Sequence, residues 1–140
     1  MTKLTFSNIR VYIDENVHNI YTELTSRASN TAEDIPFTQM PDLFVAAACV
    51  GAKENNFQEI KHKRRDIFYA DSFDQKIHIP VLIALAYKRI ENLDVLLDSQ
   101  EIINICEGWA NGGIKIIYDQ IVDGEGLRPL YRLVDYINNG

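Results

Sequence analysis

The chain has 140 residues, of which 46% are hydrophobic and 24% charged, a composition typical of one globular domain. Its 20 acidic residues outnumber the 14 basic ones, and the net charge of −6 argues against general affinity for nucleic acid. The N-terminus lacks the apolar run of a signal peptide, and the longest apolar run, residues 79–87, is too short to span a membrane. We therefore expect one cytoplasmic domain over residues 1–140, with no membrane contact.

The N-terminal quarter predicts a short extended segment followed by a helix. Residues 4–13 alternate loosely between apolar and polar types, as in a short strand. Residues 14–29 change to helical spacing, with Val17, Ile20, Tyr21 and Leu24 on one face. The polar stretch 29–36 that follows is typical of a loop.

A second helix is predicted from Thr38 to Gly51. Pro41 fits its first turn, where a missing N–H removes no hydrogen bond, and Gly51 suits the position just after its last turn. The helix is apolar on nearly all sides. The small residues 46–48 would let another helix approach closely, and we expect the Gly-Gly pair near the C-terminus to do so.

The middle of the chain carries a basic cluster, consisting of Lys61, His62, Lys63, Arg64 and Arg65. Extended pieces around Ile60 and Ile67 would place these side chains at the tip of a small hairpin. One interpretation is a solvated loop, and the other is an electrostatic contact with phosphate or with an acidic protein.

The third helix is predicted within residues 71–92. Pro80 favours a start near Ile79, preceded by a separate turn. The run 81–86 is apolar on nearly all sides, which indicates a central position in the core.

The fourth helix, residues 99–122, has the widest apolar stripe and should be central to the fold. It contains Trp109 and the pair Gly112-Gly113, and each glycine inside a helix costs about 1 kcal/mol relative to alanine. Either the helix breaks there or another backbone passes close by, and we favour close packing. Glycines at residues 123–126 end this helix, and a fifth is predicted over residues 127–138.

Catalytic and metal-binding patterns are nearly absent from the sequence. The three histidines lie in separate segments, with no metal-ligand spacing, and no cofactor is expected. Cys49 and Cys106 both lie in apolar helical patterns, so two buried thiols are expected. Glu107 adjoins Trp109 on the most apolar helix, where a structural ion pair with an arginine is favoured over a general base.

Several runs together resemble a family of small proteins associated with bacterial DNA phosphorothioation (Dnd) systems. These runs are Phe37-Thr38 before Asp42-Leu43-Phe44, the Ala46-Ala47 to Gly51 helix end, Ile83-Ala84-Leu85-Ala86, and Glu107-Gly108-Trp109-Ala110-Asn111-Gly112-Gly113. The resemblance covers most of the chain, and it implies a cytoplasmic accessory protein of a defence locus that marks or restricts DNA. It supplies no catalytic residues.

We therefore predict a mainly α fold, a single-domain bundle of about five helices with a small extended or β-hairpin element. The leading hypothesis is an accessory or regulatory subunit of a phosphorothioation-linked restriction system, which contacts protein subunits of that system and is not an enzyme. The alternatives are a DNA-binding module that uses the basic loop 61–65, and an enzyme whose site the sequence does not reveal. Homo-oligomerisation stays open.

Overall fold

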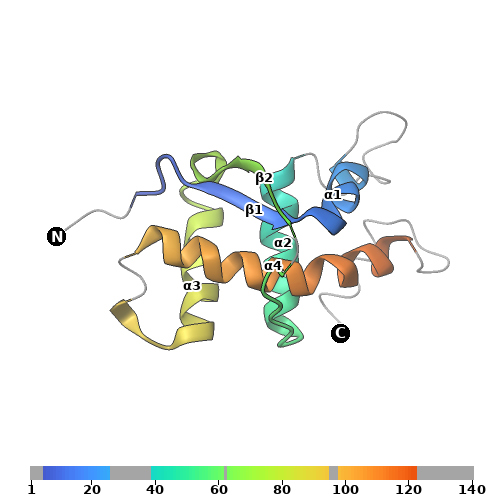
Figure 1. The fold of residues 1–140 in the computed structure, drawn as a ribbon. Helices are drawn as coiled ribbons and strands as arrows, with labels where there is room; N and C mark the ends of the chain where they lie inside the picture. The colour runs from blue at the N-terminus through green and yellow to red at the C-terminus, as the bar shows by residue number, and fades with distance from the viewer. Residues whose placement is uncertain (1–4, 26–38, 62, 95–97, 123–140) are drawn as a thin grey trace.

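The computed structural model describes residues 5–25, 39–61, 63–94 and 98–122. In chain order these residues form β1 (Arg10–Asp14), α1 (His18–Thr25), α2 (Met40–Lys53), β2 (Arg64–Tyr69), α3 (His78–Ile90) and α4 (Ser99–Val122) (Figure 1). Short 3₁₀ turns, Glu15–Val17 and Ala70–Ser72, precede α1 and follow β2. No helix in these ranges is long and apolar enough to cross a membrane.

The architecture confirms a mainly helical fold with a small β element. The described ranges contain four α-helices, where the sequence predicted about five. The predicted fifth helix, over residues 127–138, lies outside the described residues, and so do the predicted loop 29–36 and the glycine-rich stretch 123–126.

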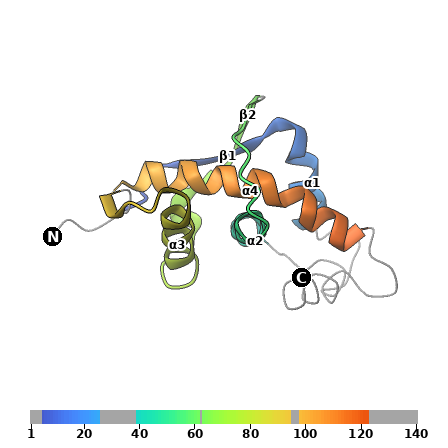
Figure 2. The ribbon, with the colours of Figure 1, turned by 90° about the horizontal axis from the view of Figure 1, so that it is seen from below.

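Helix α4 is the element against which the others pack. Figure 2 shows it lying across α2 and α3, with α2 seen end-on. Its stripe residues Ile102, Cys106, Trp109 and Ile117 are at most 1% exposed, as the three- and four-residue spacing predicted. The indole N–H of Trp109 donates a hydrogen bond of 2.9 Å to the carbonyl oxygen of Leu85 and so ties α4 to α3.

The crossing of α2 and α4 depends on glycines in both helices. Helix α4 runs unbroken through its Gly-Gly pair, which confirms the close-packing interpretation. A Cβ on Gly113 would lie 1.9 Å from the carbonyl oxygen of Ala47, and one on Gly51 would lie 1.9 Å from that of Trp109. Gly51 is thus an interior residue of α2, which continues to Lys53, and the prediction that it follows the helix was wrong.

The β element is a two-stranded antiparallel sheet of segments far apart in the sequence. Val11 lies opposite Phe68 and Asp14 opposite Arg64, with an irregularity in the register after Val11. Because α1 and α2 lie between the strands in sequence, the sheet joins the N-terminal segment to the middle of the chain. Val11 and Ile13 of β1 are buried in the core.

The starts of α1 and α3 lie close to the predicted positions. The side chain of Asp14 accepts a hydrogen bond of 2.9 Å from the backbone N–H of Asn16 and caps the 3₁₀ turn, so α1 begins only at His18. Helix α3 begins at His78, close to the start that Pro80 predicted. The separate turn expected before it is Ala70–Ser72.

Candidate functional site

The segment that links α2 to β2, here called the connecting segment, consists of residues 54–63, of which the structure describes all but 62. Asn56 and Gln58 fix it to the backbone of α4. The backbone N–H of Gln58 donates to the carbonyl oxygen of Gly108 at 3.1 Å, and the side-chain amide of Asn56 donates to that of Gly112 at 2.8 Å. A Cβ on Gly112 would lie 1.6 Å from the backbone oxygen of Asn56. Successive glycines of α4 therefore accommodate both α2 and the connecting segment.

Phe57 anchors the same segment from its side chain. Its ring lies where a Cβ on Gly108 would come within 2.3 Å, and it meets Trp109 edge to face with centroids 5.1 Å apart. The guanidinium of Arg89, from α3, lies 4.1 Å from the ring centroid, in cation–π geometry. The connecting segment is thus held by α3 as well as α4.

Glu107 joins α4 to both strands. Its side chain is only 4% exposed, and Oε1 accepts a hydrogen bond of 2.9 Å from Arg64 while Oε2 accepts one of 2.8 Å from the backbone N–H of Tyr12. Burial raises the pKa of Glu107 to about 7, although the Tyr12 N–H and the Arg64 charge oppose that rise. The guanidinium of Arg64 also lies 4.5 Å from the Tyr12 ring centroid. The predicted ion pair between Glu107 and an arginine is confirmed.

The predicted basic cluster is divided by the fold. Arg64 and Arg65 do not stand at a loop tip, because they begin β2, and each is in an ion pair with a carboxylate from another element. Lys61 and Lys63 are exposed, and among the described residues their side chains make no ion pair or hydrogen bond. His62 lies outside the described residues. Sequence reasoning could not see the split, since the strand partner of Arg64 and Arg65 lies some fifty positions upstream.

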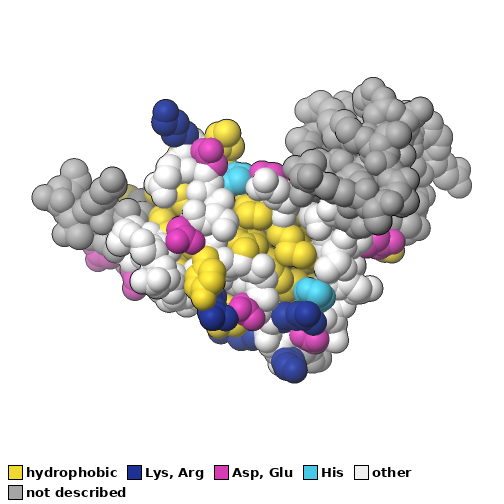
Figure 3. All heavy atoms as spheres, turned by 90° about the horizontal axis from the view of Figure 1, so that it is seen from above, with side chains coloured by type: hydrophobic (Ala, Val, Ile, Leu, Met, Phe, Trp, Pro, Cys, Tyr) yellow, Lys and Arg dark blue, Asp and Glu magenta, His cyan; other side chains and the backbone are white. Residues whose placement is uncertain are grey.

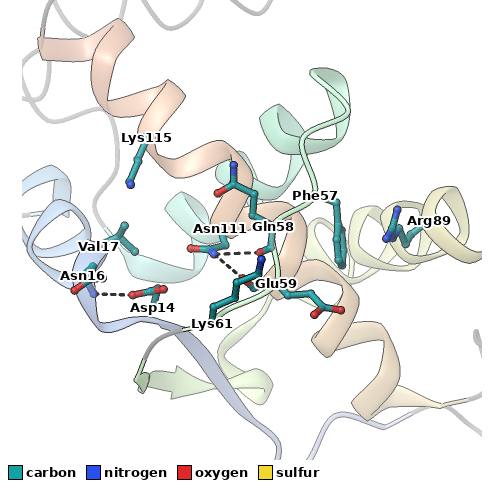
Figure 4. Close-up of a pocket in the computed structure, with 10 residues that line it drawn as sticks. All are labelled: Asp14, Asn16, Val17, Phe57, Gln58, Glu59, Lys61, Arg89, Asn111 and Lys115. Atoms are coloured by element: carbon teal, nitrogen blue, oxygen red, sulfur yellow. Dashed lines mark hydrogen bonds between the residues drawn. The ribbon is translucent and has the colours of Figure 1, made fainter.

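A cavity of about 580 Å³ opens beside the connecting segment (Figure 4). Its walls come from the end of β1 and the turn after it, the connecting segment, the middle of α4, and the end of α3. Its charged lining residues are Asp14, Glu59, Lys61, Arg89 and Lys115. The amide of Asn111, which also lines it, donates to the carbonyl oxygen of Gln58 at 3.1 Å.

Among the residues that line this cavity, the sequence pattern predicted only Lys61 as a site residue. One signal was available, because Asn111 and Lys115 are four residues apart and so share one face of α4. Their partners across the cavity come from segments that only the tertiary fold brings near. A second cavity, of about 300 Å³, is lined by Arg64 and Glu107 of the ion pair and by Glu101 and Asn104.

His78 and Cys106 occupy structural positions. Nδ1 of His78 accepts from the backbone N–H of Asp74 at 3.0 Å, which leaves Nε2, 2.9 Å from Asp42, to donate and so tie α3 to α2. Cys106 is buried, with its sulfur 3.4 Å from the carbonyl oxygen of Leu82. Among the described residues, no group of three or more His, Cys, Asp or Glu side chains is placed to hold a metal ion.

The prediction of two buried thiols is wrong for Cys49. It is exposed, because Ala47 and Gly51 turn one face of α2 toward α4 and Cys49 lies two residues from each, on the other side of the helix. Burial raises the pKa of both cysteine thiols, and far more at Cys106. Neither environment activates a thiolate.

The fold and the site together define a small helical protein with a connecting segment anchored on α4 and an adjoining polar cavity. Residues 10–138 match the family model described as DNA sulphur modification system-associated protein 4, and the chain belongs to this family. The family resemblance noted in the sequence is thereby confirmed, together with an association with DNA sulphur modification systems. No curated protein and no solved structure matches the chain.

Proposed function

We propose that this protein is a non-catalytic accessory or regulatory subunit of a DNA sulphur modification system and of the restriction linked to it. It acts by binding another protein of that system through the connecting segment. The observation that carries the proposal is the pair Lys61 and Lys63, exposed and without partners among the described residues on a chain of net charge −6. An isolated positive site on an acidic protein steers it toward an acidic partner surface.

The anchoring of the segment supports a role in recognition. Gln58 and Phe57 are held by α4 and α3 before any partner arrives, so little ordering entropy is lost when the adjacent lysines bind. A segment that served only as a connection would not require α4 to have glycine at both positions, Gly108 and Gly112, where the segment approaches it.

Protein contact is favoured over DNA because most basic groups near the segment are already neutralised. Arg64 is paired with Glu107, Arg65 with Glu15 and Arg10 with Asp66. Figure 3 looks onto the side where the sheet lies in Figure 1 and shows Lys and Arg side chains interspersed with Asp and Glu along one edge. Proteins that bind the DNA backbone tightly make about 6–10 phosphate contacts, and such a mixed surface does not provide them.

Co-purification with the other subunits of the system tests the proposal. Lys61→Glu with Lys63→Glu should abolish co-purification, because both charges that face the partner are reversed. Lys76→Glu with Lys88→Glu is the matched control, since it makes the same change in net charge at exposed positions that line neither cavity. Thermal midpoints of both double variants should stay close to wild type.

Two results would overturn the proposal. One is retention of every partner by the Lys61→Glu, Lys63→Glu variant. The other is specific loss of duplex DNA binding by that variant, with a log–log salt slope of about −0.9 per phosphate contact in wild type, which would establish the DNA-binding alternative instead.

A further inference from the structure

The larger cavity is lined by two lysines as well as by the carboxylates of Asp14 and Glu59. Figure 4 shows Lys115, from α4, and Lys61, from the connecting segment, on either side of Asn111. Within the part of the chain that the structure describes, neither amine makes an ion pair or hydrogen bond. Because neither carboxylate is in an ion pair with these amines, both amines remain available to an anionic ligand.

The remaining lining residues offer hydrogen bonds to a polar ligand. Asp14 is 6% exposed, and its Oδ1 accepts from the backbone N–H of Asn16, which leaves Oδ2 for a hydroxyl donor. The side chains of Asn16 and Asn111 line the same space. Because Asp14 and Glu59 are themselves anionic, the negative group of a ligand has to lie toward the lysines and its hydroxyl groups toward Asp14.

This cavity does not provide an aromatic side chain on which a ring of a ligand stacks. Its one aromatic lining residue, Phe57, already carries Arg89 over its ring and meets Trp109 edge to face. The volume of about 580 Å³ lies within the range of small-molecule sites, about 300–1,000 Å³. Recognition therefore rests on charge and hydrogen bonds, which come from the end of β1, from α4 and from the connecting segment.

We infer that the cavity binds a sugar phosphate, with the phosphate held by Lys61 and Lys115 and a sugar hydroxyl group donating to Asp14. This chemistry is shared by free nucleotides and by the phosphorylated end of a nucleic-acid strand. The inference goes beyond the proposed function, which concerns protein contact, and rests on different residues of the chain apart from Lys61.

Titration calorimetry on the full chain tests the inference with ribose 5-phosphate, inorganic phosphate and ribose. Ribose 5-phosphate should bind, inorganic phosphate should bind more weakly, and ribose should give no signal. Lys115→Gln should weaken binding of ribose 5-phosphate by about tenfold or more, as expected for loss of one charge-assisted contact. Lys88→Gln, on an exposed face of α3, is the matched control and should bind as wild type does.

A second variant separates the two halves of the site. Asp14→Asn retains a side chain that can cap the turn, so the fold should persist. It should weaken binding of ribose 5-phosphate but not of inorganic phosphate, because the loss of the Asp14 charge removes a repulsion and no phosphate contact. A 5′-phosphorylated oligonucleotide that displaces ribose 5-phosphate, while its unphosphorylated counterpart does not, would identify a strand end as the source of the phosphate. If the phosphorylated oligonucleotide does not displace ribose 5-phosphate, the phosphate belongs to a small molecule.

The inference is overturned if ribose 5-phosphate fails to bind at about 10 mM, or if Lys115→Gln binds it as tightly as wild type. Its failure is separable from failure of the proposed function. Lys115→Gln should retain co-purified partners, because Lys115 lies on α4 and not on the connecting segment. Lys63→Glu should lose partners while it still binds ribose 5-phosphate, because Lys63 does not line the cavity.

Discussion

The pH dependence of unfolding should report directly on Glu107. Its pKa is raised from an ordinary value of 4.5 to about 7, first by burial, while the Tyr12 N–H and the Arg64 charge act in the opposite direction. The folded state therefore binds a proton more tightly than the unfolded state does. The corresponding stability is fully present below pH 4.5 and is lost as the pH rises through 7.

The size of the effect follows from the shift. Each unit of pKa difference corresponds to about 1.4 kcal/mol, so the free energy of unfolding should fall by up to about 3 kcal/mol between pH 4.5 and pH 7 through this group alone. In Glu107→Gln the side chain cannot ionise, and this part of the fall should disappear. Replacement of Arg64 by methionine removes the charge that lowers the pKa, so the fall should extend above pH 7 and become larger.

Urea unfolding of wild type and Glu107→Gln across this pH range gives the measurement, and Asp119→Asn is the control. Asp119 is an exposed carboxylate on the same helix, so its amide variant should follow the wild-type curve. Parallel curves for wild type and Glu107→Gln would refute the reasoning. A Glu107 carboxyl carbon that titrates near pH 4.5 by NMR would refute it as well.

Two further predictions concern packing around α4. Gly113→Ala should destabilise the protein by about 1–3 kcal/mol despite the better helix propensity of alanine, because its Cβ would lie 1.9 Å from a carbonyl oxygen of α2. Urea unfolding measures this change, with Asp119→Ala as the control. An unchanged free energy of unfolding would mean that the two helices separate freely. Trp109→Ala should lower the free energy of unfolding by about 3–5 kcal/mol, since the indole is 1% exposed and hydrogen-bonded to the Leu85 carbonyl oxygen. A small change in thermal midpoint would contradict that burial.

The sequence was most informative where one local pattern determines the structure. The apolar stripe of α4 predicted the burial of Ile102, Cys106 and Trp109, because helical spacing alone places these residues on one face. The Gly-Gly pair identified the close crossing with α2, since glycines in a helix interior are unfavourable unless a neighbouring backbone needs the space. The ion pair at Glu107 was predicted because a carboxylate within an apolar helix needs a positively charged partner.

The sequence was least informative where distant segments meet. A run of basic residues looks the same whether it forms a loop or begins a strand, and only pairing with β1 decides that Arg64 and Arg65 belong to β2. Cys49 lies in an apolar run of α2, but the narrow face that meets α4 leaves it outside. The larger cavity draws lining residues from four separate parts of the chain, and no local pattern brings Asp14 near Lys115.

The residues that position the candidate site are mostly not the ones that carry its charge. Gly108 and Gly112 contribute no side chain, yet they determine how closely the connecting segment approaches α4. Through that approach they also determine where Lys61 stands relative to Lys115. Glu107 links the strands to α4 in a different way, because the carboxyl group that pairs with Arg64 at the start of β2 has a pKa of about 7. The carboxyl group that holds β1 and β2 to α4 therefore changes its charge close to neutral pH.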